Sequence, residues 1–169
     1  PILSVNSVKK KTIFVIEASS YQLEYSKIFK SKYAVILNIS PDHIERHKSL
    51  ISYTKSKFKL LKNQLKGNIA FVKKNDFLIN KELRSNKFKS KIIRVHTSKK
   101  NYFLNKINNS YFSTETNQEN LLFVLEILKK FKINKNLLIS TIQKFKGLKY
   151  RQQIIFKKND LTIINDSKS

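Results

Sequence analysis

The 169-residue sequence contains no cysteine, only two glycines and two prolines, and no long apolar run. Without cysteine, neither a disulfide framework nor a thiolate metal site can form. A membrane-spanning helix needs about 20 consecutive apolar residues, and no run in this sequence approaches that length. A basic segment followed by an apolar one is also absent from the start, so no secretory leader is expected. These absences are compatible with a cytoplasmic protein that has no membrane span.

Acidic residues are scarce as well, because 35 Lys and Arg residues stand against 11 Asp and Glu residues, giving a formal net charge of +24. Such a charge suits a nucleic-acid-binding protein, whose affinity comes from neutralising phosphates. However, only four basic residues are arginines, the side chain that base-reading and phosphate-binding sites favour. The lysines are scattered along the chain, and the abundance of Lys, Asn, Ile and Phe is expected of a protein encoded by an AT-rich genome. We therefore expect no specific nucleic-acid function, and keep a basic nucleic-acid-binding domain as the alternative.

Apolar runs and helical patterns alternate along the chain, whose 40% hydrophobic content is enough for the core of one domain. The patterns predict strands at residues 13–16, 33–37, 69–72 and 92–95, and helices at 21–29, 49–67, 76–83, 117–131 and 136–145. Antiparallel pairs are expected around residues 108–109 and between 153–156 and 161–164. This order indicates an α/β fold, with a largely parallel sheet, flanking helices and a small antiparallel β portion.

Two polar clusters follow directly after expected parallel strands. The first runs from Glu17 to Glu24, and the second from Asn38 to His47. Ligands of open α/β sheets bind at the carboxyl ends of strands, so Glu17 and His43 could share a divalent cation with phosphate oxygens and water. Spacing alone leaves plainer alternatives open. A strand-end glutamate often caps a helix or forms an ion pair, and His43 could be a hydrogen-bonded loop residue.

Six segments carry recognisable motifs. Residues 17–24 read Glu-Ala-Ser-Ser-Tyr-Gln-Leu-Glu, and residues 38–46 read Asn-Ile-Ser-Pro-Asp-His-Ile-Glu-Arg. The others are residues 53–57 (Tyr-Thr-Lys-Ser-Lys), 117–120 (Asn-Gln-Glu-Asn), 145–151 (Phe-Lys-Gly-Leu-Lys-Tyr-Arg) and 165–168 (Asn-Asp-Ser-Lys). In this order, and over nearly the whole chain, they resemble the motifs of the Mur ligase family. The first segment resembles the members that add D-glutamate; another Mur ligase or a folylpolyglutamate synthase-like ligase is the alternative.

The resemblance implies the central ATP-binding domain of that family, which has a P-loop-NTPase-like fold. Mur ligases activate a carboxylate by phosphoryl transfer from ATP, and an amine then displaces the phosphate to form an amide. By resemblance, the cofactors would be ATP and Mg2+, and the substrates UDP-N-acetylmuramoyl-L-alanine and D-glutamate. The parent enzyme would be a cytoplasmic monomer that acts in peptidoglycan precursor synthesis.

The resemblance also assigns roles to three residues at the predicted centre. Glu17 and His43 would belong to the magnesium environment that bridges the nucleotide phosphates and the forming acyl phosphate. Lys57 matches a lysine that carries a carbamate in the family, and this anion would offer magnesium further oxygen ligands. Without the resemblance, Lys57 would be read as a solvated helix lysine. Neighbouring Lys55 and Lys59 would help to keep its amine neutral, as carbamate formation requires.

The remaining assignments concern the nucleotide and the substrates. The nucleotide would be bound by Asn117, Asn120, Arg151 and Asp166. The muramoyl-alanine substrate or the incoming glutamate would be faced by Ser19, Gln22 and Lys168. Asparagine also caps helices well, which is the alternative for the two asparagines.

The chain departs from the family pattern in three places. Thr116 stands where the family has histidine, and Lys149 and Tyr150 stand where it has Pro-His. More importantly, the family's glycine-rich phosphate loop is missing, because Gly67 and Gly147 are the only glycines. We therefore expect residues 1–169 to form one partial central domain without its first strand and phosphate loop. The N-terminal UDP-binding and C-terminal amino-acid-binding domains would be absent too, and the piece alone would have no ligase activity.

Overall fold

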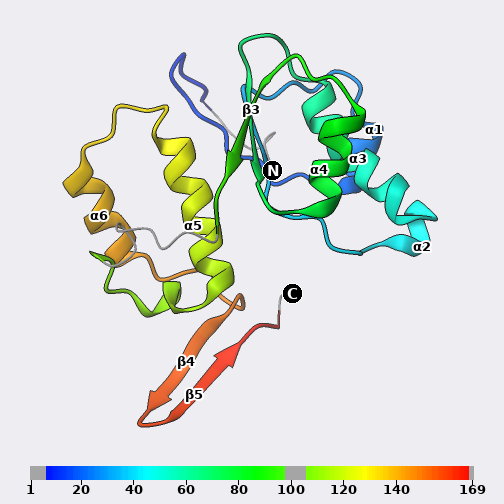
Figure 1. The fold of residues 1–169 in the computed structure, drawn as a ribbon. Helices are drawn as coiled ribbons and strands as arrows, with labels where there is room; N and C mark the ends of the chain where they lie inside the picture. Colours follow the sequence, from blue (N-terminus) through cyan, green and yellow to red (C-terminus); the bar gives the residue numbers. More distant parts are fainter. Residues whose placement is uncertain (1–6, 98–105, 168–169) are drawn as a thin grey trace.

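The computed structural model describes residues 7–97 and 106–167, and the chain divides into two halves (Figure 1). The sheet half (residues 7–97) contains a parallel sheet of order β1-β2-β3. Its strands are β1 (Tyr33–Ile36), β2 (Ile69–Lys73) and β3 (Lys91–Val95). Between them run α3 (Leu50–Lys62) and α4 (Phe77–Ser85) as crossover helices. The alternation of parallel strands and helices confirms the α/β fold that the sequence predicts.

The parallel sheet is covered on both faces. On one face, Ala70 and Val72 of β2 pack with Phe58 of α3 and Ile79 of α4, and all four are fully buried. On the other face, Phe71 of β2 packs against Leu122 and Phe123 of α5 (Glu115–Leu128), which belongs to the helical half (residues 106–167). Because side chains alternate across a strand, the apolar run of β2 supplies both layers.

Capping side chains set where the main helices begin. Ser49 Oγ accepts a hydrogen bond of 3.1 Å from the N–H of Ser52 at the start of α3, as the sequence predicts. Asp76 caps α4 in the same way, whereas the cap of α5 is Thr114, not the expected Asn117. The predicted end of α3 at Gly67 is wrong, because the helix stops at Lys62.

Two shorter helices pack against α3. Helix α1 (Ser20–Tyr25) overlaps the predicted 21–29 helix but ends four residues earlier, and α2 (Ile44–His47) follows the loop after β1. In the helical half, α6 (Lys135–Lys144) follows α5 and begins at the cap Asn134, not at the expected Asn136. None of the helices in residues 7–97 and 106–167 is long and apolar enough to cross a membrane.

Two predicted strands are wrong. Residues 13–16 have no strand structure, and their apolar side chains are 41–96% exposed. An apolar run becomes a strand only when a neighbour pairs with it, and no strand in the described part of the chain does so here. Residues 110–113 form the 3-10 helix η3 (Ser110–Ser113), because the Asn109 side chain accepts from the N–H of Tyr111 and stabilises a tight turn. The other half of that expected hairpin, residues 102–104, lies outside the described residues.

The C-terminal antiparallel pair is present as predicted. Strands β4 (Gln153–Lys158) and β5 (Leu161–Asn165) form a two-stranded sheet with Ile154 opposite Ile164. The hairpin extends away from α5 and α6 (Figure 1). It supplies the small antiparallel portion expected beside the parallel sheet.

Candidate functional site

A cavity of about 380 Å³ joins three separate segments of the sheet half. Glu17 comes from the segment before α1, His43 from the loop after β1, and Lys57 from α3. The sequence predicts that these three residues meet, and the structure places them around this one cavity. Its other lining residues are Ala18, Ser19, Ser20, Gln22, Asp42 and Tyr53.

The two predicted substrate residues next to Glu17 bond to each other. The Gln22 N–H donates to Ser19 Oγ at 3.3 Å, and the Ser19 N–H donates to Gln22 Oε1 at 2.8 Å. This reciprocal capping box begins α1 and satisfies two backbone donors that the helix leaves free. Both side chains therefore line the cavity while they also hold the helix start.

His43 sits at a conformationally demanding position. Its φ angle of 52° lies in the left-handed region, a backbone conformation that residues other than glycine rarely adopt. Asp42 holds the residue at both ends: Oδ1 accepts from the His43 N–H at 2.9 Å, and Oδ2 lies 3.2 Å from Nε2 of the imidazole. The ring centroid is 5.0 Å from that of Tyr21. The imidazole is thus oriented at the cavity while its side chain stays 46% exposed.

The loop that carries His43 is anchored from a distant element. Asp76 accepts from the N–H of Ile39 through Oδ2, and from the N–H of Ile79 at the start of α4 through Oδ1, both at 3.0 Å. One carboxylate therefore holds the loop after β1 and caps α4. Asp76 is one of the residues that sequence reasoning did not connect with the site.

Lys57 reaches the cavity from the middle of α3 and is half-buried. Its Nζ lies 4.8 Å from the ring centroid of Tyr53, one helical turn earlier, which is cation–π distance. The expected help from Lys55 and Lys59 finds no support, because neither lines the cavity. Lys59 donates instead to the carbonyl oxygen of Glu24 in α1.

The donor set can be tested against magnesium by its chemistry. Glu17 and Asp42 offer the carboxylate oxygens that hard cations prefer, and His43 offers one ring nitrogen. Within residues 7–97 and 106–167, no three His, Cys, Asp or Glu side chains gather closely enough to hold a metal ion unaided. A carbamate on Lys57 would add oxygen ligands. The types of donor atom around the cavity therefore suit a hard cation such as Mg2+.

The predicted nucleotide-binding residues lie apart from this cavity, in the helical half. The Asn117 side chain is buried, and its Nδ2 donates to the carbonyl oxygen of Tyr111 at 2.7 Å. Asp166 Oδ1 accepts from the N–H of Gln152 at 3.2 Å. Asn120 and Arg151 are exposed. None of the four lines the cavity with Glu17. Lys168, predicted at the substrate, lies outside the described residues.

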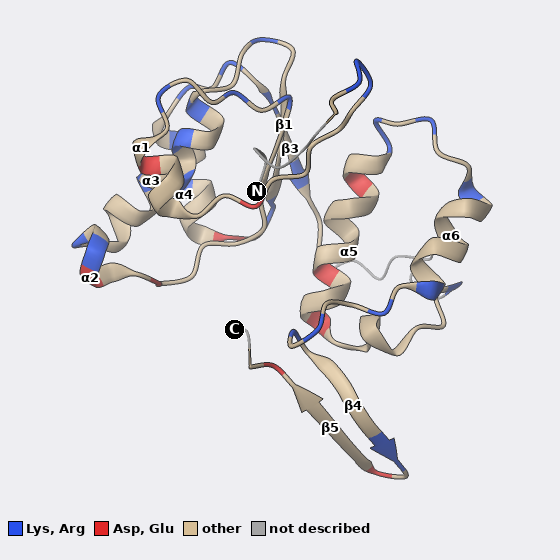
Figure 2. Ribbon diagram, turned by 180° about the vertical axis from the view of Figure 1, so that it is seen from behind, with Lys and Arg blue, Asp and Glu red and all other residues tan. Residues whose placement is uncertain are grey.

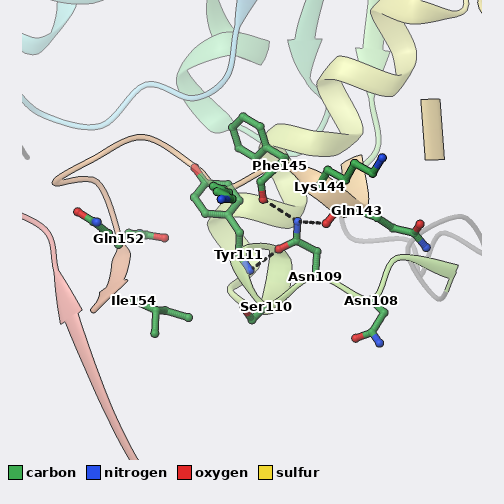
Figure 3. Close-up of a pocket in the computed structure, with 11 residues that line it drawn as sticks. Asn108, Asn109, Ser110, Tyr111, Gln143, Lys144, Phe145, Gln152 and Ile154 are labelled. Carbon is green, nitrogen blue, oxygen red and sulfur yellow. Dashed lines mark hydrogen bonds between the residues drawn. The ribbon is translucent and has the colours of Figure 1, made fainter. Parts of the chain in front are cut away.

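A second cavity, of about 760 Å³, lies between η3, α6 and the start of β4 (Figure 3). Asn109 is central to it, with Nδ2 donating to the carbonyl oxygens of Ile142 and Phe145, both at 2.8 Å. The Tyr111 ring packs edge-on against Phe145. Because the Asn109 amide already holds the end of α6, its donor is committed to the fold.

Basic residues occur in both halves of the described chain. Figure 2 shows Lys and Arg on helices, strands and loops of both halves. This distribution agrees with the scattered lysines of the sequence.

Comparisons with known proteins point in one direction. Residues 2–142 match the Mur ligase middle domain. The chain is 34% identical, over 100% of its length, to 41% of the UDP-N-acetylmuramoylalanine–D-glutamate ligase of Buchnera aphidicola subsp. Schizaphis graminum. It is 32% identical, over 98% of its length, to 38% of the ligase of the same name from Francisella tularensis subsp. novicida. The chain thus spans about two fifths of the curated relatives it matches.

A solved structure shows the same fold. MurF from Acinetobacter baumannii superposes with a TM-score of 0.62 at 16% identity, covering 87% of this chain and 35% of that chain. At this identity the likeness concerns the fold alone. It agrees with the parallel sheet and flanking helices described above.

Proposed function

Because the chain belongs to the Mur ligase family, through its match to that family's middle domain, we propose that it is part of a ligase joining D-glutamate to UDP-N-acetylmuramoyl-L-alanine. In this reaction ATP phosphorylates the alanine carboxylate, and the amine of glutamate displaces the phosphate to form an amide. The parent enzyme would be a cytoplasmic monomer of peptidoglycan precursor synthesis. The names of the relatives in two bacterial genera support this choice of substrates.

The observation that carries the proposal is the meeting of Glu17, His43 and Lys57 at one cavity. These residues would hold Mg2+, which when bound offsets charge on the nucleotide and the reacting carboxylate. Asp42 keeps the His43 imidazole oriented through its 3.2 Å contact with Nε2. The chain's own contribution is therefore to fix the oxygen and nitrogen donors before any ligand arrives.

The other predicted residues would act around this centre. Ser19 and Gln22 line the same cavity and would face the muramoyl-alanine substrate or glutamate. Lys168, which lies outside the described residues, is proposed for the same role. Asn120 and Arg151 are exposed and free to meet a nucleotide, whereas Asn117 would act by holding the start of α5. Asp166 would bind the ribose hydroxyls while its Oδ1 also accepts from the Gln152 N–H.

We further propose that residues 1–169 are a partial central domain of a longer protein. The UDP-binding and amino-acid-binding domains would lie in other parts of that protein, because the chain covers only about two fifths of its relatives. The two glycines cannot build a glycine-rich phosphate loop. We therefore expect the purified 169-residue chain to form no amide product from ATP, UDP-N-acetylmuramoyl-L-alanine and D-glutamate.

The test is a chimeric enzyme in which residues 1–169 replace the matched segment of the Buchnera aphidicola relative. We expect ATP-dependent incorporation of labelled D-glutamate into UDP-N-acetylmuramoyl-L-alanine. Glu17→Ala, His43→Ala and Lys57→Ala should each lower kcat by about 100-fold or more, since they remove groups at the reacting centre. Lys55→Ala is the matched control, because Lys55 lies on the same helix but outside the cavity. A folded chimera that binds ATP but forms no labelled product would contradict the proposal.

The carbamate on Lys57 has its own test. In 13C-bicarbonate, the chain should show a carbamate carbonyl resonance that disappears in Lys57→Ala and persists in Lys55→Ala. Mg2+ should strengthen the signal, because the cation binds only the modified, anionic form. A spectrum identical in both variants would place any carbamate elsewhere.

A further inference from the structure

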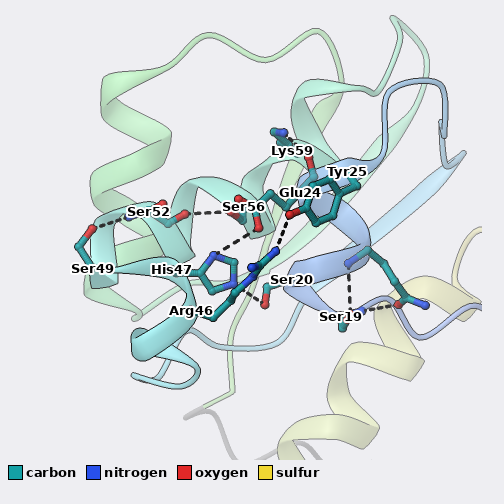
Figure 4. A network of polar contacts seen from close by, with 11 residues as sticks. Ser19, Ser20, Glu24, Tyr25, Arg46, His47, Ser49, Ser52, Ser56 and Lys59 are labelled. Atoms are coloured by element: carbon teal, nitrogen blue, oxygen red, sulfur yellow. Dashed lines mark hydrogen bonds and ion pairs between the residues drawn. The ribbon is translucent and has the colours of Figure 1, made fainter.

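His47 is a buried histidine that neither the reaction nor the motif analysis uses. It ends α2, and its side chain has an exposed fraction of 0%. The ring lies between α1 and α3, stacked on Tyr21 at 5.4 Å between centroids and tilted against Tyr53 at the same distance. Nε2 lies 3.0 Å from Ser20 Oγ (Figure 4). A polar ring buried this deeply is costly unless its nitrogens are bonded.

Its second ring nitrogen faces a charge. Nδ1 is buried and has no hydrogen-bond partner within the described residues, and Glu24 Oε2 lies 3.8 Å away. A lone pair directed at a carboxylate is repelled, whereas an N–H directed at it is attracted. The Glu24 charge therefore favours a proton on Nδ1. Nε2 is then left to accept a hydrogen bond from the Ser20 hydroxyl.

The contacts of His47 lead to the cavity from three sides. Ser20 and Tyr53 both line the cavity. Ser20 follows Glu17 closely in the chain, and Tyr53 lies one turn before Lys57 on α3. The Tyr21 ring stacks on the His47 ring, and its centroid also lies 5.0 Å from that of the His43 ring. One buried imidazole thus contacts Ser20 and Tyr53 of the cavity lining, and also Tyr21, whose ring lies next to that of His43.

We propose that His47 is a positioning residue for this site. As the Nδ1–H tautomer it accepts from Ser20 and fixes α1, the His43 loop and α3 relative to one another. Only the nature of the bound ligand, a divalent cation, rests on the proposed function. The tautomer and the coupling to His43 are properties of the protein itself.

The local fold has other anchors, so a change at His47 acts on geometry and not on folding as a whole. Lys59 Nζ donates to the carbonyl oxygen of Glu24 and ties α1 to α3 separately. Leu23 of α1 is buried in its own right. Arg46 of α2 donates to the Tyr25 hydroxyl. Figure 4 shows Lys59, Glu24, Arg46 and Tyr25 around the His47 ring.

The first experiment needs no ligand. The chain has three histidines, so 15N-histidine labelling resolves the tautomer of each ring. We expect the Nδ1–H form at His47 and a shift toward the Nε2–H form in Glu24→Gln, which removes the facing charge. A wild-type Nε2–H form, or a Glu24→Gln spectrum that does not change, would overturn the assignment.

The second experiment follows His43 as the reporter. His47→Phe keeps the ring volume and the stack on Tyr21 but removes Nε2, so the His43 ring resonances should shift while those of His96 stay in place. Ser20→Ala should reproduce the shift, and the double variant should add nothing. His47→Gln can place an amide near Nε2 and should restore the wild-type position. Unchanged His43 resonances in both single variants would refute the role.

The third experiment uses Mn2+ alone as the probe. Mn2+ should broaden the His43 resonances of the wild type, and His47→Phe should weaken its binding about ten-fold, as expected when a supporting contact of a metal site is lost. Equal affinity in the two proteins would count against positioning. If Mn2+ leaves His43 of the wild type untouched, the proposed magnesium site fails, while the tautomer and the His43 shifts still decide the role of His47.

Discussion

In the sheet half (residues 7–97), motif side chains from three separate segments line one cavity, whereas in the helical half (residues 106–167) Asn117 and Asp166 hold neighbouring backbone. Lys57 and His43 illustrate the first use, because both reach the cavity from different elements. Asn117 illustrates the second, because its amide is spent on the carbonyl of Tyr111. The same kind of motif match therefore has different structural meanings in the two halves.

Packing follows the same division. Phe58, Leu61 and Ile79 of the sheet half are fully buried. In the helical half, the strands of the hairpin leave large apolar side chains in solvent, with Ile155 57% and Phe156 45% exposed. A site needs rigid support to hold its donors in place. The sheet half provides that support for the side chains around Glu17, His43 and Lys57.

The largest expected effect tests whether the sheet half carries the stability. Phe58→Ala should lower the free energy of unfolding by about 3–5 kcal/mol, because it removes a fully buried ring and leaves a cavity. Phe156→Ala, the matched change on the hairpin, should cost less than about 1 kcal/mol. Urea denaturation measures both. Equal losses would erase the contrast between the halves.

A smaller effect tests whether Asn117 is structural. Asn117→Ala should cost about 1–3 kcal/mol, since it leaves the Tyr111 carbonyl without its buried donor. Asn120→Ala removes an exposed side chain of the same kind one turn away and should change stability by about 0.5 kcal/mol at most. If chemical denaturation shows the reverse order, the helical half uses its asparagines as the sheet half uses its motif residues.

The smallest effect tests the ion pair that joins the halves. Lys73 Nζ at the end of β2 lies 2.7 Å from Glu119 Oε1 in α5, with both side chains about one fifth exposed. A double-mutant cycle with Lys73→Met and Glu119→Gln should give a coupling energy of about 1 kcal/mol that shrinks in high salt. A coupling energy of zero would mean that apolar packing alone holds the halves together.

Much of the sheet half can be predicted because its signals are local. Ser49 marks the start of α3, because its side chain caps the helix. The apolar run at residues 69–72 marks the central strand β2. The place of His43 follows from a general rule, because ligands of open α/β sheets bind at the carboxyl ends of parallel strands and His43 lies in the loop after β1. Glu17 lines the same cavity although the strand expected before it, at residues 13–16, is not formed. Pairing and burial at a distance are not local. The run at 13–16 lacks a strand neighbour in the described structure, and sequence patterns do not report neighbours.

The functional details that sequence reasoning missed are tertiary contacts. His47 contacts Ser20, which lies 27 positions earlier in the chain, so its burial becomes visible only when α1 and α2 are placed together. The role of Asp42 beside His43 could have been found, because the two are adjacent in the motif. The cap of α5 at Thr114 shows the opposite error, in which a motif asparagine is mistaken for the helix start.

The two oxygens of Asp76 impose a mechanical constraint on the molecule. Since one holds the N–H of Ile39 and the other the N–H of Ile79, the loop after β1 and the first turn of α4 are linked through a single rigid group. A displacement of this loop that widened the cavity would pull on α4 and, through it, on the crossover to β3. We therefore expect any opening of the site to move α4 together with the loop after β1.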